Sequence, residues 1–423
     1  MNQSETSYDV IVIGAGIIGI SSALKLQSEG HRVLVLDRSG VAKETSFGNA
    51  GAFAFADIVP LATPGIMRKA PKWLLDPLGP LTIKPAYALK IIPWMLKFWR
   101  ASWQDKYQAA MTAQASLMAL SKAALERQIK AVNGEAMMRR EGQLQLYEGE
   151  AEFNASLPGW KTRMEHGVVC ELLESPEAIA RIQPGIDPRF THGGFTPEWI
   201  NTTDPEAWTL HLYQAFTKKG GRYENASVSR LIPQGDGVLL QLSDEGAQQS
   251  KSYSAKRVVV AAGAWSKTLA ASLGEKIPLE TERGYNTTLP KGDFELNTHV
   301  TFSNHGFVVS KIGDQIRVGG AVELGGLHLK PNYKRSQVLL DKAARFLRGF
   351  NKEDGKQWMG FRPSMPDSLP VVSYSAKTDR VIYAFGHGHL GLTQSAGTAE
   401  LVAALVSGEE PPIPVAPFSA NRF

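Results

Sequence analysis

The residues Tyr8-Asp-Val-Ile-Val-Ile-Gly-Ala-Gly-Ile-Ile-Gly-Ile20 have the pattern of a buried strand, a glycine turn and the start of a helix. In such a turn Gly14 permits the sharp exit from the strand, Gly16 lets a pyrophosphate approach the backbone, and Gly19 lets the helix pack on the strand. The phosphate charge then meets the N-terminus of the helix. The spacing predicts a dinucleotide site, with a plain β-α-β unit as the alternative.

A second apolar strand, Arg32-Val-Leu-Val-Leu-Asp37, strengthens this interpretation. Glycine spacings arise by chance in a chain with 40 glycines, so the prediction of a dinucleotide site rests on the flanking strands and helix. Asp37 ends the second strand about 20 residues after the turn, where a carboxylate can accept hydrogen bonds from both hydroxyls of an adenosine ribose. Asp37 therefore argues against a cofactor that carries a 2′-phosphate.

Composition bounds the class of protein and its compartment. The chain has 423 residues, which favours two intertwined domains, and its 43% hydrophobic and 21% charged residues are typical of a soluble globular protein. A single cysteine, Cys170, excludes an internal disulfide and fits a reducing compartment. The N-terminus has no pattern of a secretory leader, so we expect a cytoplasmic protein.

Charge gives a weaker indication of partners. The formal net charge is +5, but the basic residues are interspersed with acidic ones along the whole chain. We therefore expect no nucleic-acid binding. A mild positive balance suits an anionic substrate or an anionic membrane surface.

Prolines and aromatic residues crowd together between residues 57 and 103. No stretch there reaches the roughly 18 uninterrupted apolar residues that a spanning helix needs. Residues 85–103 instead mix Leu, Ile, Trp, Phe and Met with Lys90, Lys97 and Arg100, which is the composition of a helix on a lipid interface. This segment is either a peripheral contact with the inner face of the cell membrane or a lid or packing helix.

Further elements follow from hydrophobic periodicity and turn residues. Residues 256–266 should form a buried strand beside the first one, followed by a Gly/Ala turn and a helix. The remaining expectations are helices over 105–133, from 176, over 205–219 and up to about 407, strands at 143–147 and 381–385, and an antiparallel sheet over 277–327.

Four separated segments add a more specific signal. They are Thr45-Ser-Phe-Gly-Asn-Ala-Gly51, residues 258–266, Arg283-Gly-Tyr285, and Gly360-Phe-Arg-Pro-Ser-Met-Pro-Asp-Ser-Leu-Pro370 leading into 387–395. With the first glycine motif they resemble the D-amino acid oxidase-like family of FAD-dependent oxidoreductases, and most closely its bacterial D-amino acid dehydrogenase branch. The resemblance spans nearly the whole chain.

The resemblance implies an α/β fold in which a Rossmann-like FAD-binding domain is interleaved with an α+β substrate domain that carries a large mixed or antiparallel sheet. We assign residues 1–56, part of 133–275, and 355–423 to the FAD-binding domain. Residues 57–132 would form an aromatic and helical insertion, and 276–354 the substrate domain.

The resemblance also implies an FAD site. Cys170 lies outside the flavin-contacting segments, so we expect FAD to be bound noncovalently. Backbone close to a flat ring and a helix N-terminus pointed at it would favour the anionic reduced flavin. The expected cofactor-binding residues are Gly14, Gly16, Ile17, Ile18, Gly19, Asp37, Arg38, Thr45, Ser46, Asn49, Ala50, Gly51, Val228, Ala262, Gly263, Trp265, Gly388, His389, Leu390, Gly391, Leu392 and Thr393.

Three residues are candidates for the reaction itself. The planar guanidinium of Arg362 suits a bidentate grip on a substrate carboxylate, where the resemblance places an arginine; a surface ion pair is the alternative. Tyr285 matches a tyrosine that lies over the flavin and helps to hold the same carboxylate, unless it is a core tyrosine. His389 donates a hydrogen bond to flavin or substrate, or packs in its loop. His387 and His389 lack further ligands, so we expect no metal.

Together these residues predict an enzyme that transfers a hydride from the Cα of a D-amino acid to flavin N5. A quinone or another acceptor other than oxygen would then take the electrons. Residues 279–283 depart from the form that the resemblance implies for D-alanine enzymes, which argues against D-alanine as the principal substrate and leaves D-proline or hydroxy-D-proline as candidates. The alternatives are a glycine or sarcosine oxidase-like enzyme that uses oxygen, and an FAD-binding electron-transfer subunit of a hetero-oligomeric amine dehydrogenase.

Overall fold

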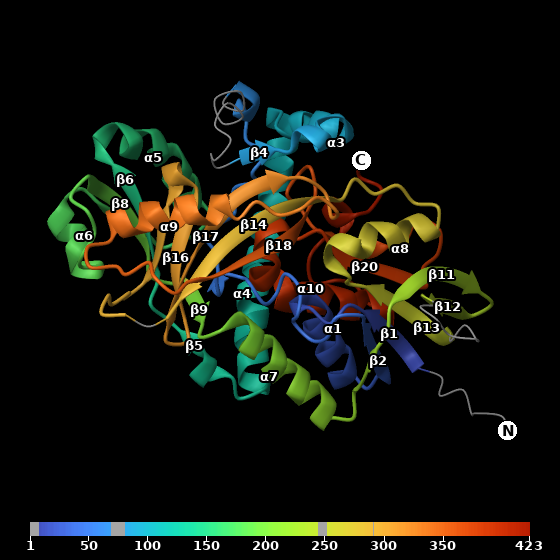
Figure 1. Ribbon diagram of the computed structural model, residues 1–423. Coiled ribbons are helices and arrows are strands. Elements are labelled where there is room, and N and C mark those ends of the chain that lie inside the picture. The colour runs from blue at the N-terminus through green and yellow to red at the C-terminus, as the bar shows by residue number, and fades with distance from the viewer. Residues whose placement is uncertain (1–7, 69–80, 244–251, 291) are drawn as a thin grey trace.

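A computed structural model describes residues 8–68, 81–243, 252–290 and 292–423. The chain forms two large β-sheets that lie side by side, with helices packed against each (Figure 1). Part of the predicted proline- and aromatic-rich segment, residues 69–80, lies outside the described residues.

The first sheet contains the predicted dinucleotide-binding strands. Its order is β10-β2-β1-β13-β12-β11, with β20 paired to β13 and β19 paired to β20. β1 pairs in parallel with both β2 and β13, as the sequence predicted for the segment that begins at Lys256. The strands are β1 (Tyr8–Ile13), β2 (Val33–Asp37), β10 (Arg222–Asn225), β11 (Val228–Gln234), β12 (Gly237–Leu242), β13 (Ser252–Val260), β19 (Val371–Tyr374) and β20 (Val381–Phe385).

Helices cover both faces of this sheet, which explains why β1 is apolar at nearly every position. Val10 and Val12 pack toward one face, under α1 (Ile17–Ser28), α4 (Gln104–Ala131), α7 (Pro205–Lys218) and α10 (Gly391–Ser407). Ile11 and Ile13 pack toward the other face, with α8 (Ser266–Ser272). The predicted helices over 105–133 and 205–219, and the one ending near 407, are confirmed to within two residues.

The second sheet is mixed. Its order is β18-β14-β17-β16-β15-β6-β8-β7, with β4 paired to β17; most pairs are antiparallel, but β15–β6 and β17–β4 are parallel. The helices α5 (Gly149–Glu165), α6 (Pro176–Ile182) and α9 (Lys334–Phe346) pack on it. The strands are β4 (Leu81–Ile83), β6 (Gln143–Glu148), β7 (Glu171–Leu173), β8 (Phe190–Thr196), β14 (Glu280–Leu289), β15 (His299–Phe302), β16 (Phe307–Ile312), β17 (Gln315–Leu324) and β18 (Lys356–Ser364).

The sheet pairings divide the segment of which only part was expected in the FAD-binding domain. Within residues 133–275, β6, β7 and β8 belong to the second sheet, whereas β10, β11, β12 and β13 belong to the first. β18 also joins the second sheet, because it pairs with β14 from Glu280↔Ser364 to Thr288↔Lys356. The long-range register that decides this membership has no local sequence signal. As a result Arg362 reaches the site from the second sheet, whereas α10 approaches it from the first.

Short elements connect the two sheets. β3 (Ala52–Phe53), β9 (Ile200–Thr202) and β5 (Met138–Arg139) form a three-stranded sheet. The other short elements are the 3-10 helices η1 (Pro85–Tyr87), η2 (Glu135–Met137), η3 (Gly263–Trp265), η4 (Ser303–His305), η5 (Gly388–Leu390) and η6 (Ala416–Phe418).

The helix α3 (Ala88–Ala101) stands at the edge of the second sheet. Ile91 and Trp94 bury one side of the helix against Leu324 of β17. In the part of the chain that the structure describes, no helix is long and apolar enough to span a membrane.

Candidate active site

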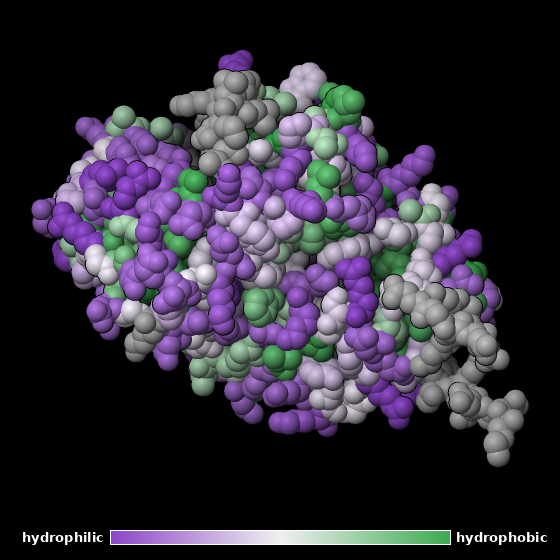
Figure 2. Space-filling model, in the orientation of Figure 1, coloured by the Kyte–Doolittle hydropathy of each residue, from purple (hydrophilic) through white to green (hydrophobic). Residues whose placement is uncertain are grey.

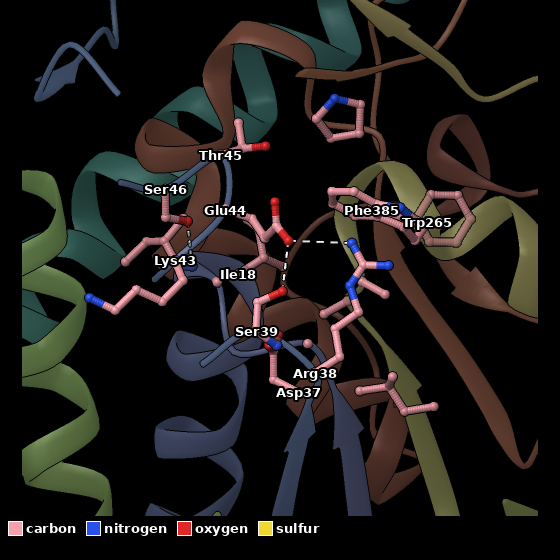
Figure 3. Close-up of a pocket in the computed structure, with 18 of the residues that line it drawn as sticks. Ile18, Asp37, Arg38, Ser39, Lys43, Glu44, Thr45, Ser46, Trp265 and Phe385 are labelled. Carbon is pink, nitrogen blue, oxygen red and sulfur yellow. Dashed lines mark hydrogen bonds and ion pairs between the residues drawn. The ribbon is translucent and has the colours of Figure 1, made fainter. Parts of the chain in front are cut away.

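A cavity of about 400 Å³ opens at the carboxyl ends of β1, β2, β13 and β20 (Figure 3). Ile13, Asp37, Ala261 and Phe385 line it where these strands end. Ligands of open α/β sheets bind in the crevice beyond these strand ends. The cavity is therefore where the glycine motif predicted a dinucleotide.

Two of the motif glycines, Gly14 and Gly19, have the predicted structural roles, and the role of Gly16 toward a pyrophosphate stays a prediction. Gly14 has a φ of +111°, and a Cβ there would overlap the carbonyl oxygen of Ala261. A Cβ at Gly19 would overlap the carbonyl oxygen of Gly14, so the helix packs on the turn itself. Gly16 is the N-cap of α1 and has no side chain, and no acidic residue lies in the first turn. The first turn of α1 therefore borders the cavity without a competing carboxylate, although the N–H of Ile17 is bound by the hydroxyl of Ser46.

Asp37 organises the loop that follows β2. Its Oδ2 accepts a hydrogen bond from the N–H of Ala15 at 2.8 Å, and its Oδ1 accepts from the N–H groups of Ser39 and Gly40 at 2.7 and 3.0 Å. The carboxylate therefore joins the glycine turn to the end of β2 and lines the cavity.

A charged and aromatic cluster closes one side of the cavity (Figure 3). The guanidinium of Arg38 lies 4.0 Å from the ring centroid of Trp265 and 3.3 Å from the carboxylate of Glu44. Ser39 donates a hydrogen bond to the same carboxylate at 2.7 Å. Ser39 and Glu44 were not predicted, because their contacts depend on the conformation of the loop that follows β2, which has no local sequence signal.

The loop of residues 45–51 is held against the second sheet. Thr45 donates to the carbonyl of Phe361 at 2.7 Å, and Arg317 donates to the carbonyl of Asn49 at 2.5 Å. Ser46 turns toward α1, where its Oγ accepts a hydrogen bond from the N–H of Ile17 at 3.0 Å. The predicted loop thus connects the glycine turn to the strand that carries Arg362.

Most of the expected cofactor-binding residues line the cavity. Those that do are Gly14, Gly16, Ile17, Ile18, Asp37, Arg38, Thr45, Ser46, Asn49, Val228, Ala262, Gly263, Trp265, Gly388, Gly391 and Leu392. Those outside the lining are Gly19, Ala50, Gly51, His389, Leu390 and Thr393. Lining residues that sequence reasoning missed include Lys43, Ser227, Ser229, Ser243, Thr268, Pro363 and His387, most of which adjoin a predicted residue in the chain.

His387 lines the cavity as a neutral ring. Burial lowers the pKa of His387 to about 3, and its Nε2 lies 2.9 Å from the hydroxyl of Thr398. Within the described residues, no group of three or more His, Cys, Asp or Glu side chains has the arrangement of a metal site.

Arg362 lies beside the cavity, next to the lining residue Pro363. Its guanidinium rests over the backbone of Gly284, where a Cβ would overlap it, and Nη1 donates to the carbonyl of Ala321 at 2.9 Å. Ala321 has a φ of +57° close to a register shift between β14 and β17, which turns its carbonyl toward the arginine. No other hydrogen bond from the guanidinium reaches a described residue.

His389 and Glu282 complete a cluster around Arg362. Glu282 stands opposite Arg362 in the β14–β18 pairing, and His389 Nε2 lies 2.6 Å from Glu282 Oε2. Burial would raise the pKa of Glu282, but the adjacent His389 and Arg362 outweigh it and hold this pKa below its usual value. The sequence did not identify Glu282 as a site residue.

Tyr285 lies apart from this cluster. Its hydroxyl donates to Glu323 at 2.8 Å and accepts from the N–H of Asn332 at 3.0 Å. Burial, with a contribution from Glu323, raises the pKa of Tyr285 to about 12, so the hydroxyl keeps its proton. Strand alternation turns Tyr285 away from the face of β14 that carries Glu282. The structure does not bring Tyr285 together with Arg362.

Comparison with known proteins identifies the class. Residues 9–405 match the sequence profile of the DAO family, described as FAD dependent oxidoreductase, and the chain belongs to this family of flavin enzymes.

Individual relatives are similar over their whole length. The chain is 35% identical to a protein named D-amino-acid oxidase from Bradyrhizobium diazoefficiens and 31% identical to one named D-amino acid dehydrogenase from Allorhizobium ampelinum, with 98% of each chain covered in both cases. The solved glycine oxidase from Geobacillus kaustophilus has the same fold, with a TM-score of 0.78, 20% identity and 99% of each chain covered.

The residues of the cavity fit FAD, the cofactor of this family. Glycine backbone at Gly14, Gly16, Gly263 and Gly388 lines the cavity. A Cβ at Gly263 would meet no atom within 4 Å, so the space beside it is open. Such backbone lets phosphates and a flat ring approach closely.

Proposed function

We propose that this chain oxidises the Cα–N bond of a D-amino acid. The observation that carries the proposal is the guanidinium of Arg362, which has one protein partner among the described residues and lies beside the cavity whose residues fit FAD. A planar guanidinium with free N–H groups is suited to bind a carboxylate through two hydrogen bonds. Two of the relatives named above act on D-amino acids by name, which supports the same substrate class.

Bound FAD supplies the acceptor for the hydride that leaves Cα. Arg362 fixes the carboxylate, and with it the position of Cα against the end of the cavity. His389 and Glu282 lie beside Arg362, where the amine of the same substrate would lie. Tyr285 takes no direct part in this arrangement, because its hydroxyl binds Glu323, which also binds Arg283 at 3.3 Å. We infer noncovalent binding of FAD, and D-proline or hydroxy-D-proline as the preferred substrates.

The test is an anaerobic titration of the purified flavoprotein. Paired D- and L-amino acids, glycine and sarcosine are added in turn, and the visible flavin absorbance is recorded. Bleaching by D-enantiomers, with D-proline or hydroxy-D-proline most effective, supports the proposal. Bleaching by glycine or sarcosine alone favours the oxidase-like alternative. A protein that no amine bleaches would contradict a catalytic role and favour an electron-transfer subunit.

We also propose that the electrons pass to a quinone at a membrane surface. The exposed side of α3 supports this, because large apolar side chains recur there every three or four residues, and they gather at the upper edge of the molecule (Figure 2). They are Leu89, Ile92, Leu96, Trp99 and, just beyond the helix, Trp103, with exposed fractions from 47 to 83%.

Charge on α3 agrees with an anionic lipid surface. Lys90 and Lys97 are exposed on the same helix, and long basic side chains of this kind interact with acidic headgroups. The start of the helix is also joined to the substrate side of the molecule, because the hydroxyl of Tyr87 donates to Glu280 at 3.0 Å. Glu280 precedes Glu282 by two positions on β14.

Vesicle binding tests this part of the proposal. Wild-type protein should sediment with anionic vesicles at low salt and less at high salt. The double variant Leu96→Ser/Trp99→Ser should stay in the supernatant, whereas Met164→Ser, which removes an exposed side chain from α5, should bind like wild type. Equal sedimentation of all three proteins would contradict the assignment of α3. Peroxide formation that matches substrate consumption, without quinone reduction, would contradict the quinone.

A further inference from the structure

We propose that His389 and Glu282 act as a dyad in which His389 takes a proton from the substrate ammonium group and Glu282 positions and stabilises the imidazole. This inference rests on the proposed function and assigns a further residue to it. An aliphatic ammonium group loses its proton only near pH about 10, so roughly one molecule in a thousand is neutral at pH 7. Hydride loss from Cα needs the nitrogen lone pair, so the enzyme gains by removing this proton.

The hydrogen bond between the two side chains fixes the tautomer of His389. Glu282 is buried beside the guanidinium of Arg362, whose positive charge favours the ionised carboxylate. An ionised carboxylate only accepts hydrogen bonds, so Nε2 of His389 must carry the hydrogen that points to Oε2 across 2.6 Å. The lone pair of the neutral ring then lies on Nδ1, where it can accept a proton.

Nδ1 of His389 is available for this reaction. It has no hydrogen-bond partner among the described residues, and His389 is an exposed residue. The side chain of His389 is 36% exposed, whereas that of Glu282 is 8% exposed. Glu282 is thus protected from water, whereas His389 can exchange protons with solvent after each turnover.

Charges around the dyad suit a zwitterionic substrate. Arg362 stands opposite Glu282 in the sheet and would hold the carboxylate. Asp57 also lies near His389 and faces Arg163 at 3.8 Å, but burial raises the pKa of Asp57. The carboxylate of Glu282 is therefore the main negative charge beside His389, and Arg362 stands opposite it in the sheet. An imidazolium formed at His389 is stabilised by this arrangement.

The proton and electron balance of the step is simple. One N–H bond of the ammonium group breaks, an N–H bond forms at Nδ1 of His389, and the electron pair stays on the substrate nitrogen. The hydride then leaves Cα with two electrons as the lone pair forms the C=N bond. The imidazolium returns its proton to water.

Anaerobic flavin reduction at saturating D-amino acid from pH 6 to 10 tests the dyad. At pH 7, His389→Gln should slow reduction at least about 100-fold, the range of a lost general base, and Glu282→Gln about 10-fold. Both variants should approach the wild-type rate near pH 10, because the substrate amine is then neutral without help. Glu148→Gln is the matched control, since it removes the carboxylate from a second His–Glu pair, with His305 at 2.9 Å; it should keep the wild-type profile.

A second readout separates the dyad from a structural role. Propionate, a carboxylate without an amine, should perturb the flavin spectrum of both variants with a Kd within about twofold of wild type. A defect of equal size at every pH, or a loss of propionate binding as large as the loss of reduction rate, would overturn the inference. Failure of wild-type protein to be reduced by any D-amino acid is a different result, which contradicts the proposed function instead.

Discussion

Replacement of Arg362 by alanine should weaken substrate binding far more than it affects the fold or the flavin. The guanidinium uses Nη1 for Ala321 and has no other partner among the described residues, so a substrate carboxylate can take its remaining N–H groups. Removing one member of a hydrogen-bonded charge pair costs about 2–5 kcal/mol. Without Arg362 the substrate carboxylate also faces the negative charge of Glu282, so we expect a loss of at least about 3 kcal/mol.

A loss of about 3 kcal/mol corresponds to a Kd roughly 150-fold higher. The assay is anaerobic reduction of the flavin by stopped flow at increasing concentrations of the best D-amino acid, with FAD content measured on the same samples. Arg362→Lys keeps the charge but not the planar fork, and should lose about tenfold. Arg348→Ala removes an exposed arginine and is the control. A Kd for Arg362→Ala within threefold of wild type would refute the carboxylate assignment.

Two further predictions concern the cofactor site and acid stability. Gly263→Ala and Gly274→Ala should each lower the free energy of unfolding of the apoprotein by about 1 kcal/mol, because both glycines have positive φ and open space beyond Cβ. Only Gly263→Ala, which changes a cavity residue, should weaken FAD binding, by tenfold or more in a fluorescence titration. Equal effects of both variants on the Kd for FAD would contradict the assignment of the cavity as the FAD site.

Burial lowers the pKa of His299 to about 4, so an unfolded chain binds a proton below pH about 6.5 that the folded chain does not. Folding stability is therefore lost as pH falls. Between pH 7 and pH 5, the free energy of unfolding measured in urea should fall by about 2 kcal/mol less for His299→Phe than for wild type. An equal pH dependence of this free energy in both proteins would contradict the assignment to His299.

The parts of the site that depend on short chain segments were predictable from the sequence. The glycine turn, the end of β2 at Asp37 and the strand at Lys256 follow from local pattern, and the structure confirms their arrangement. Arg362 was expected from the family resemblance of its segment, and its role stays a prediction, whereas Glu282, which stands opposite it in the sheet, was not expected. Glu282 gains its place only through the pairing of β14 with β18 and the approach of His389, which is 107 positions away in the chain.

Strand register also explains why Tyr285 and Arg362, both expected to bind the substrate, lie on opposite faces of the sheet. Tyr285 follows Gly284, the residue over which Arg362 lies, so adjacent positions on β14 face opposite sides. Without the register of β14 the sequence leaves the face of each side chain undetermined. The same reason applies to β6, β7 and β8, whose membership in the second sheet is set by partners far along the chain.

The most direct test of the central claim is a single turnover of a racemic amino acid under anaerobic conditions. Equimolar flavoprotein and racemic proline are mixed, and the remaining enantiomers are separated by chiral chromatography. The account predicts that the D-enantiomer disappears in step with flavin reduction, one molecule for each FAD, while the L-enantiomer remains. Consumption of L-proline, or reduction of the flavin without loss of the D-enantiomer, would contradict it.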